Sequence, residues 1–126
     1  MKMKVRAIRD AGVRDKERIV FDVLEDTNIN EYAVLLSEHV SSDGAKAGPM
    51  QAYWFVNTVV SAGDLVVLYT KDGIRRSKDR ANGSMSHFSY WSLPTPVFTE
   101  PEIGFIIIEM GDWNAITAQD EDDTDL

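Results

Sequence analysis

The apolar residues of this chain recur with a period of two in short runs, and this pattern constrains the fold more than any other feature. Basic and apolar side chains alternate over residues 2–7, and Ile19, Phe21 and Val23 continue the alternation in the next segment. Side chains along a β-strand point alternately to its two faces, so each run predicts a strand with one buried face. Apolar residues with helical spacing recur nowhere over a useful length, and we therefore expect an all-β fold.

Two later segments are apolar on both faces. Residues 65–69 and 105–108 carry apolar side chains at both parities, as strands do when they are covered on both sides. Residues 51–60 and 87–93 are rich in aromatic and β-branched residues, which also favour strands, and turn-forming residues separate the segments. Together they predict about seven short strands in an antiparallel β-sandwich.

Residues 28–39 allow two structures. Asn28 followed by Glu31 matches a capping box, which would begin a helix, whereas Tyr32 to Leu36 equally fits a strand. We favour the strand. The alternative is an α+β fold with one short helix near residues 29–39.

The negative charge is concentrated at the end of the chain. The protein has 126 residues and a net charge of −8, and five of its acids lie in the last seven residues, which leaves a net charge of −3 for residues 1–119. A block of like charges repels itself and buries nothing. We therefore expect a single β-sandwich domain over residues 1–118 and a disordered acidic tail over residues 119–126.

The composition also excludes several kinds of site. The chain has no cysteine, so disulfides, thiolate nucleophiles, zinc fingers and iron–sulfur clusters are excluded. The N-terminus lacks the apolar segment of a secretory signal, and no apolar run approaches the ~20 residues of a membrane-spanning helix. We expect a cytoplasmic protein without membrane contact and without a cofactor.

The middle of the chain follows a recognisable order of strands and turns. Its elements are an aromatic strand with Tyr53 and Phe55, a turn at Gly63, a hydrophobic strand over residues 66–69, and Trp91 after a long loop. This order resembles the lamin-tail-like immunoglobulin-type β-sandwich domains, and residues 31–36 look like an early strand of that family. The resemblance spans residues 31–110. It implies an immunoglobulin-like fold and a non-catalytic interaction module, which in some relatives binds proteins or nucleic acid.

Two histidines, His39 and His87, are the candidates for metal binding and catalysis. Neither has further ligands at a metal-binding spacing, so we expect no metal site. His87 with Ser84 or Ser86 would need a distant carboxylate to activate a nucleophile, and neither serine lies in a nucleophile-elbow motif. Glu109 is the acid placed among apolar residues. We expect no catalytic residue, unless His87, Glu109 and a serine converge in one pocket.

The long segment between residues 70 and 86 is the most basic internal part of the chain. Its candidate phosphate-binding residues are Arg75, Arg76, Lys78 and Arg80, preceded by Lys71. The segment lacks the patterns of nucleotide-binding loops, and its glycines follow Asp72 and Asn82, as in tight turns.

Nucleic-acid binding would need more than this loop. Lys2, Lys4 and Arg6 form a second cationic stripe, and Tyr53, Trp54 and Trp91 are the candidate stacking residues. A pI near 4.6 argues against a protein that is dedicated to a polyanion.

The three consecutive aromatic residues Tyr53, Trp54 and Phe55 cannot all face one core, because neighbours in a strand point to opposite faces. One side therefore needs a second cover, and a partner subunit would supply it in a homodimer. Our leading interpretation is a non-catalytic interaction or structural module that self-associates through this aromatic face. The alternative is nucleic-acid or phosphate-ligand binding through residues 71–80.

Overall fold

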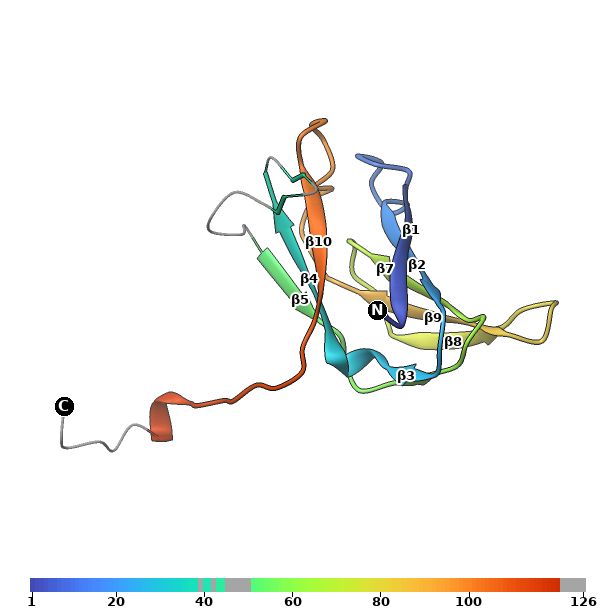
Figure 1. The fold of residues 1–126 in the computed structure, drawn as a ribbon. Helices are drawn as coiled ribbons and strands as arrows, with labels where there is room; N and C mark the ends of the chain where they lie inside the picture. The colour runs from blue at the N-terminus through green and yellow to red at the C-terminus, as the bar shows by residue number, and fades with distance from the viewer. Residues whose placement is uncertain (39, 42, 45–50, 121–126) are drawn as a thin grey trace.

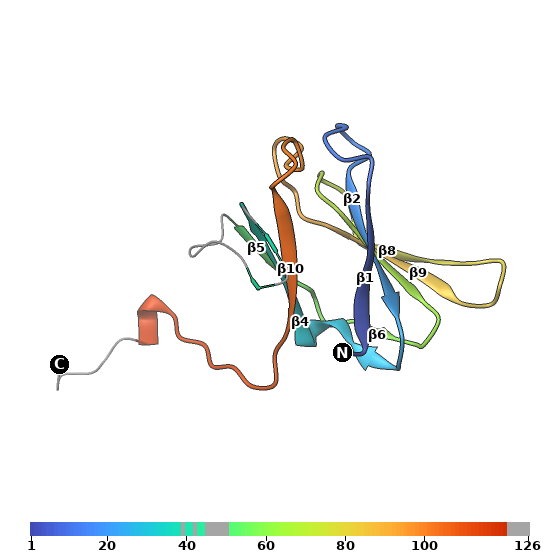
Figure 2. The same ribbon diagram turned by 45° about the horizontal axis from the view of Figure 1, so that its top comes forward.

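Two β-sheets face each other and enclose the core between them (Figure 1, Figure 2). The structure is a computed structural model that describes residues 1–38, 40–41, 43–44 and 51–120. Within these residues the regular structure is strand, apart from two single-turn 3-10 helices, η1 (Ile29–Glu31) and η2 (Ala118–Asp120). The expected all-β fold is confirmed.

The larger sheet has five strands. In spatial order they are β1 (Met3–Arg9), β2 (Arg18–Val23), β7 (Leu65–Tyr69), β9 (Met85–Tyr90) and β8 (Arg76–Asp79). Neighbouring strands pair antiparallel except β7 and β9, which run parallel. The antiparallel expectation is therefore wrong for this one pair, which brings the ends of β7 and β9 side by side.

The smaller sheet has three strands, with β4 (Tyr32–Ser37) between β10 (Gly104–Glu109) and β5 (Gln51–Trp54). A short pair, β3 (Thr27–Asn28) and β6 (Val59–Val60), lies between the two sheets along the chain.

The choice of a strand after Asn28 is confirmed over Tyr32–Ser37. The Asn28 side chain does accept a hydrogen bond from the Asn30 amide, at 3.0 Å, as a helix cap would. Only the single turn Ile29–Glu31 follows it, because the next residues pair with both β5 and β10. The alternative helix is therefore wrong for the described residues, and residue 39 lies outside them.

Phe21 lies at the centre of the core. Its ring meets the rings of Phe55 and Phe105 edge to face, each at a centroid distance of 5.9 Å. Phe105 lies in β10 and Phe55 directly follows β5, so β2 contacts both sides of the smaller sheet. Burial of a side chain of this kind contributes roughly 1.5–3 kcal/mol. The residues that share this core come from both sheets: Met3, Ile19, Phe21, Val23, Tyr32, Val34, Leu36, Phe55, Val66 and Leu68.

The described residues form ten strands rather than about seven. The additional strands are the two-residue pair β3 and β6 and the polar strand β8, which interrupts the long loop expected over residues 70–86. All four side chains of β8 are exposed, so it has no apolar face that its sequence would reveal.

The C-terminal segment leaves β10, contacts Trp54 of β5 through the ring of Trp113, and then runs away from both sheets (Figure 1). The part of the expected acidic tail at residues 121–126 lies outside the described residues. Among those that are described, no helix is long and apolar enough to cross a membrane.

Candidate nucleic-acid interface

The outer face of the five-stranded sheet carries basic and aromatic side chains. Ile19, Phe21, Val66 and Leu68 point into the core, so the residues that alternate with them point outward. Strand register arranges the outward residues in three rows: Arg9, Arg18, Tyr69 and Tyr90; Ala7, Val20, Val67, Phe88 and Arg76; and Lys4, Asp22, Leu65, Ser86 and Lys78.

Three aromatic rings form the middle of this face, which we call the aromatic stripe: Tyr69, Phe88 and Tyr90. The rings of Tyr69 and Tyr90 are stacked, with centroids 5.5 Å apart and planes 10° apart. The Phe88 ring lies 6.4 Å from Tyr69. Gly73 packs against Tyr90 so closely that a Cβ atom there would lie 2.4 Å from the ring.

Cations cover the aromatic stripe. The Arg18 guanidinium and the Lys71 ammonium lie 5.8 Å and 5.1 Å from the Tyr69 centroid. The Arg76 guanidinium lies 4.6 Å from the Phe88 centroid. Such cation–π contacts are worth about 0.5–1 kcal/mol at exposed sites, which is enough to hold a long side chain in place but weak enough to exchange.

The outer face is positive although the whole chain is negative. Asp22 pairs with Arg6 at 3.1 Å, and Asp10 pairs with Arg18 at 2.6 Å. The cations that share the face with these two acids outnumber them: Lys4, Arg6, Arg9, Arg18, Lys71, Arg76 and Lys78. Positive charge is thus in excess on this surface.

The structure separates the candidate phosphate-binding residues. Arg76 and Lys78 point outward from β8, while Arg75 precedes that strand and lines cavities with Ser77 and Tyr53. Arg80 donates to the Gly63 carbonyl at 3.1 Å and to Ser84 Oγ at 2.9 Å, so it ties the β8–β9 turn to the body of the domain.

The two basic stripes that are far apart in the sequence lie on the same face. Lys4 and Arg6 come from β1 at one edge of the larger sheet, and Arg76 and Lys78 come from β8 at the other edge. Between these edges, β7 and β9 supply the aromatic stripe.

The candidate stacking residues lie elsewhere. Tyr53 and Trp91 pack against the core, with ring centroids 5.7 Å apart, and Trp54 belongs to the smaller sheet. Phe88 and Tyr90 alternate with His87 and Ser89 in the sequence, but this pattern does not show which face of the sheet the two rings share.

The three consecutive aromatic residues also divide between two sides of β5. Phe55 is buried in the core and Tyr53 packs against it, with ring centroids 5.2 Å apart. Trp54 points the other way and is 42% exposed. Its Nε1 donates to the Asn30 carbonyl at 2.6 Å, and the Trp113 ring meets it edge to face at 4.6 Å.

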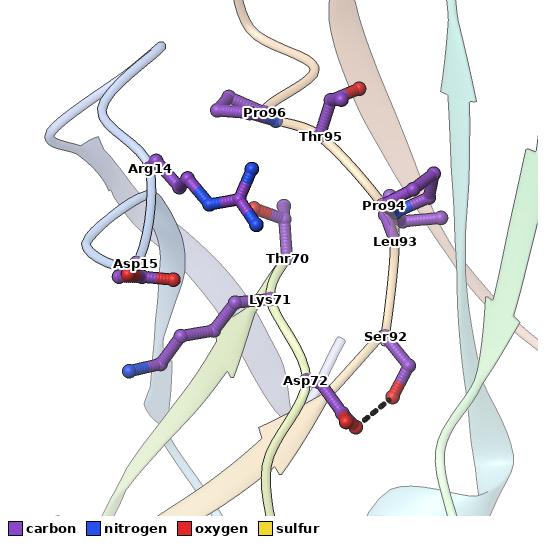
Figure 3. A pocket seen from close by; sticks show the side chains of 10 residues that line it. All are labelled: Arg14, Asp15, Thr70, Lys71, Asp72, Ser92, Leu93, Pro94, Thr95 and Pro96. Carbon is purple, nitrogen blue, oxygen red and sulfur yellow. Dashed lines mark hydrogen bonds between the residues drawn. The ribbon is translucent and has the colours of Figure 1, made fainter.

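A cavity of about 350 Å³ lies at the end of the aromatic stripe (Figure 3). Arg14 points into it from one wall, Lys71 and Asp72 form the second, and Ser92 with the following prolines forms the third. The ladder of β7 and β9 continues into this cavity, because the Ser92 amide donates to the Lys71 carbonyl at 3.1 Å.

The Glu17 carboxylate forms hydrogen bonds with the segments that surround this cavity. Its side chain is only 1% exposed and accepts from the Gly12 amide at 2.7 Å, from Thr70 Oγ1 at 2.9 Å, and from the Val97 and Phe98 amides at 2.8 Å and 3.0 Å. Three segments distant in sequence are therefore held by one buried carboxylate.

His87, Glu109 and the serines Ser84 and Ser86, whose convergence would have indicated a catalytic site, do not converge. Glu109 is exposed at the end of β10 and accepts from the Tyr32 hydroxyl at 2.6 Å. His87 instead contacts Asp64 and Ser77, which the sequence did not connect with it. Ser84 bonds Arg80, and His39 lies outside the described residues. Within the described residues no group of three or more acids and histidines is placed to hold a metal ion.

Comparison with known proteins found no matching family model, no matching curated protein and no matching solved structure.

Proposed function

We propose that this chain is an interaction module that binds single-stranded nucleic acid on the outer face of its larger sheet. The observation that carries the proposal is the placement of cations from both edge strands, β1 and β8, on either side of the aromatic stripe. Cations neutralise phosphates, and aromatic rings offer stacking surfaces to unpaired bases.

The aromatic stripe favours a single strand over a duplex. Stacking on a protein ring needs a base whose own face is free, and each such stack is worth about 1–3 kcal/mol. In this proposal Lys71 and Arg76 move from the rings of Tyr69 and Phe88 to phosphate oxygens and bases take their place, while Arg18 keeps its ion pair with Asp10. The exchange costs little because the cation–π contacts that it breaks are weak.

The charge of the whole chain does not oppose this proposal strongly. The acids that lie on the face, Asp10 and Asp22, are each paired with an arginine. At physiological ionic strength charges farther away than about 8 Å are largely screened. A phosphate on the face therefore responds mainly to the local cations.

For the fold we propose an immunoglobulin-like sandwich of the lamin-tail type. Two facing sheets support it, as do the strand over Tyr32–Ser37 and the turn at Gly63, where φ is +91° directly before the hydrophobic strand β7. Gly63 adopts a conformation that other residues rarely adopt.

Self-association is a second candidate function, favoured by the outer face of the smaller sheet. Register places Ile108, Ala33 and Trp54 in one row and Ile106, Leu35 and Ala52 in the next. Trp54 is the member of the three aromatic residues that remains exposed there. Light scattering over a range of concentrations tests this candidate, since a strictly monomeric protein would remove it.

Binding of labelled oligonucleotides tests the main proposal. Fluorescence anisotropy with a single strand of about 12 nucleotides, and with a duplex of the same sequence, compares the two ligands at about 50 mM salt. We expect the single strand to bind more tightly. Equal affinity for the duplex would leave no role for the aromatic stripe, and absence of binding to both would end the proposal.

A further inference from the structure

His87 links a buried carboxylate to an exposed serine. Its Nε2 lies 2.8 Å from Asp64 Oδ2, and its Nδ1 lies 2.8 Å from Ser77 Oγ. Asp64 and His87 are 5% and 7% exposed, whereas Ser77 is exposed on the edge strand β8. These three residues form a continuous hydrogen-bonded chain from the interior to the surface.

Strand pairing fixes the relative positions of these three hydrogen-bonded residues. Ser77 is directly opposite His87 in the antiparallel pair of β8 and β9, and Val66 is its neighbour on the other side in β7. Asp64 precedes β7 and accepts two more hydrogen bonds at 3.0 Å, from the amides of Ser61 and Met85. The carboxylate therefore cannot rotate without losing several bonds.

The bonding pattern sets the proton on the imidazole. Burial alone raises the pKa of Asp64, but the hydrogen bonds from Ser61, His87 and Met85 outweigh it and the pKa lies below its usual value. An ionised carboxylate only accepts, so His87 Nε2 carries the hydrogen. In the neutral imidazole the lone pair of Nδ1 then faces the hydroxyl of Ser77, as the base faces the nucleophile in serine hydrolases.

The serine opens into a cavity of about 210 Å³ with positive charge at its rim. Arg75 and Thr58 line this cavity together with Ser77 and His87, whereas the Arg76 guanidinium lies over the Phe88 ring. The Arg75 guanidinium would stabilise negative charge on a substrate carboxylate or on the oxygen of a tetrahedral intermediate.

We propose that Ser77, His87 and Asp64 form an acyl-transfer site that hydrolyses small esters carrying an anionic group. Ser77 Oγ bonds to the acyl carbon while its proton passes to His87 Nδ1, and the ester C–O bond breaks as that proton passes to the leaving alcohol. A water molecule then gives a proton to Nδ1 as its oxygen bonds to the acyl carbon. The bond between that carbon and Ser77 Oγ breaks, and the proton passes from Nδ1 to Oγ, which releases the acid and restores the Ser77 hydroxyl. Asp64 acts as a positioning residue that stabilises the imidazolium. This activity goes beyond the proposed binding function and does not depend on it.

A serine-directed fluorophosphonate tests the proposal on the full chain. After incubation, peptide mass spectrometry locates the adduct, and the rate of labelling is followed over pH. We expect one adduct, on Ser77, whose rate of formation falls in acid because a protonated imidazole cannot accept the serine proton.

Variants separate this site from a purely structural arrangement. Ser77→Ala should abolish labelling, and its exposed position makes it compatible with folding. Asp64→Asn should slow labelling at least about a hundredfold, in the direction known for such triads. Ser86→Ala, on the opposite face of β9, is the matched control and should label like the wild type. No adduct, an adduct that survives Ser77→Ala, or a rate at Ser77 that does not fall in acid would overturn the proposal.

Discussion

The rings of Tyr69 and Tyr90 lie parallel on the outer face of the larger sheet, with centroids 5.5 Å apart and planes 10° apart. They meet because β7 and β9 run parallel and in register, with Tyr69 opposite Tyr90. Phe88 precedes Tyr90 by two residues on the same strand, and its ring lies 6.4 Å from Tyr69, so the three rings adjoin between the basic edges of the sheet.

Removing one ring of the stripe should weaken binding without unfolding the domain. Phe88→Leu keeps an apolar side chain but removes both the stacking surface and the ring beneath Arg76. We expect the affinity for a single-stranded oligonucleotide to fall by about 1–3 kcal/mol, roughly 5-fold to 150-fold. Fluorescence anisotropy measures this affinity. Trp54→Leu is the control on the smaller sheet, and an equal loss in both variants would refute a specific role for the stripe.

Replacing the buried carboxylate should destabilise the protein. Glu17→Gln keeps the shape but turns one acceptor oxygen into a donor amide, which then faces the backbone amides or the Thr70 hydroxyl that now donate to it. We expect a loss of about 2–4 kcal/mol in the free energy of unfolding, measured by urea denaturation. The exposed Glu100→Gln should change it by less than about 0.5 kcal/mol. A Glu17 variant as stable as wild type would show that the carboxylate is not needed as a clamp.

The stability of the fold should decrease in acid partly through Asp64. The pKa of this carboxyl is below its ordinary value in the folded state, because hydrogen bonds to the charged form outweigh the effect of burial. The folded state therefore favours the ionised form, and this contribution is present above about pH 4 and is lost as the pH falls through the folded pKa. Asp64→Asn should flatten the acid limb of a plot of unfolding free energy against pH. An unchanged acid limb would contradict the assignment.

The Tyr32 hydroxyl should ionise at a higher pH than an ordinary tyrosine hydroxyl. Burial, followed by its hydrogen bond to Glu109, raises its pKa to about 12. Because the folded state favours the neutral phenol, this contribution to stability is complete below about pH 10 and is lost between about pH 10 and 12. Ultraviolet titration follows the phenolate, and Glu109→Gln should move the Tyr32 transition to lower pH. A transition that stays in place would show that Glu109 does not contribute.

The sequence predicted the strands whose burial gives them an alternating or continuous apolar pattern. β2, β4 and β7 belong to this group and are largely buried, while β1 buries Met3 and β10 packs partly buried apolar residues against the core. β8 escaped prediction because its side chains are exposed and its conformation depends on pairing with β9. The parallel pairing of β7 with β9 could not be predicted either, because it is a contact between segments that are distant in the sequence.

The residues of the candidate sites were visible individually, but their grouping was not. Arg76 and Lys78 were expected to bind phosphate, yet only strand register shows that they share a face with Lys4 and with the aromatic stripe. His87 was considered with Ser84 and Ser86, its neighbours in sequence. Its hydrogen-bond partners in the structure are Ser77, which lies in β8, and Asp64, which lies in the turn before β7. No sequence motif connects these residues with His87.

Arg75 and Arg76 allow the most direct test of nucleic-acid binding, because Arg76 lies over the Phe88 ring on the outer face, whereas Arg75 precedes β8 and lines a cavity with Tyr53. Affinity for a labelled single strand is measured for the wild type, Arg76→Ala and Arg75→Ala over a series of salt concentrations. We predict that Arg76→Ala weakens binding and reduces the slope of log K against log salt by about 0.7, the contribution of one phosphate contact, while Arg75→Ala leaves the slope unchanged. Equal effects of the two substitutions, or no binding by the wild type at low salt, would contradict an interface on the outer face of the larger sheet.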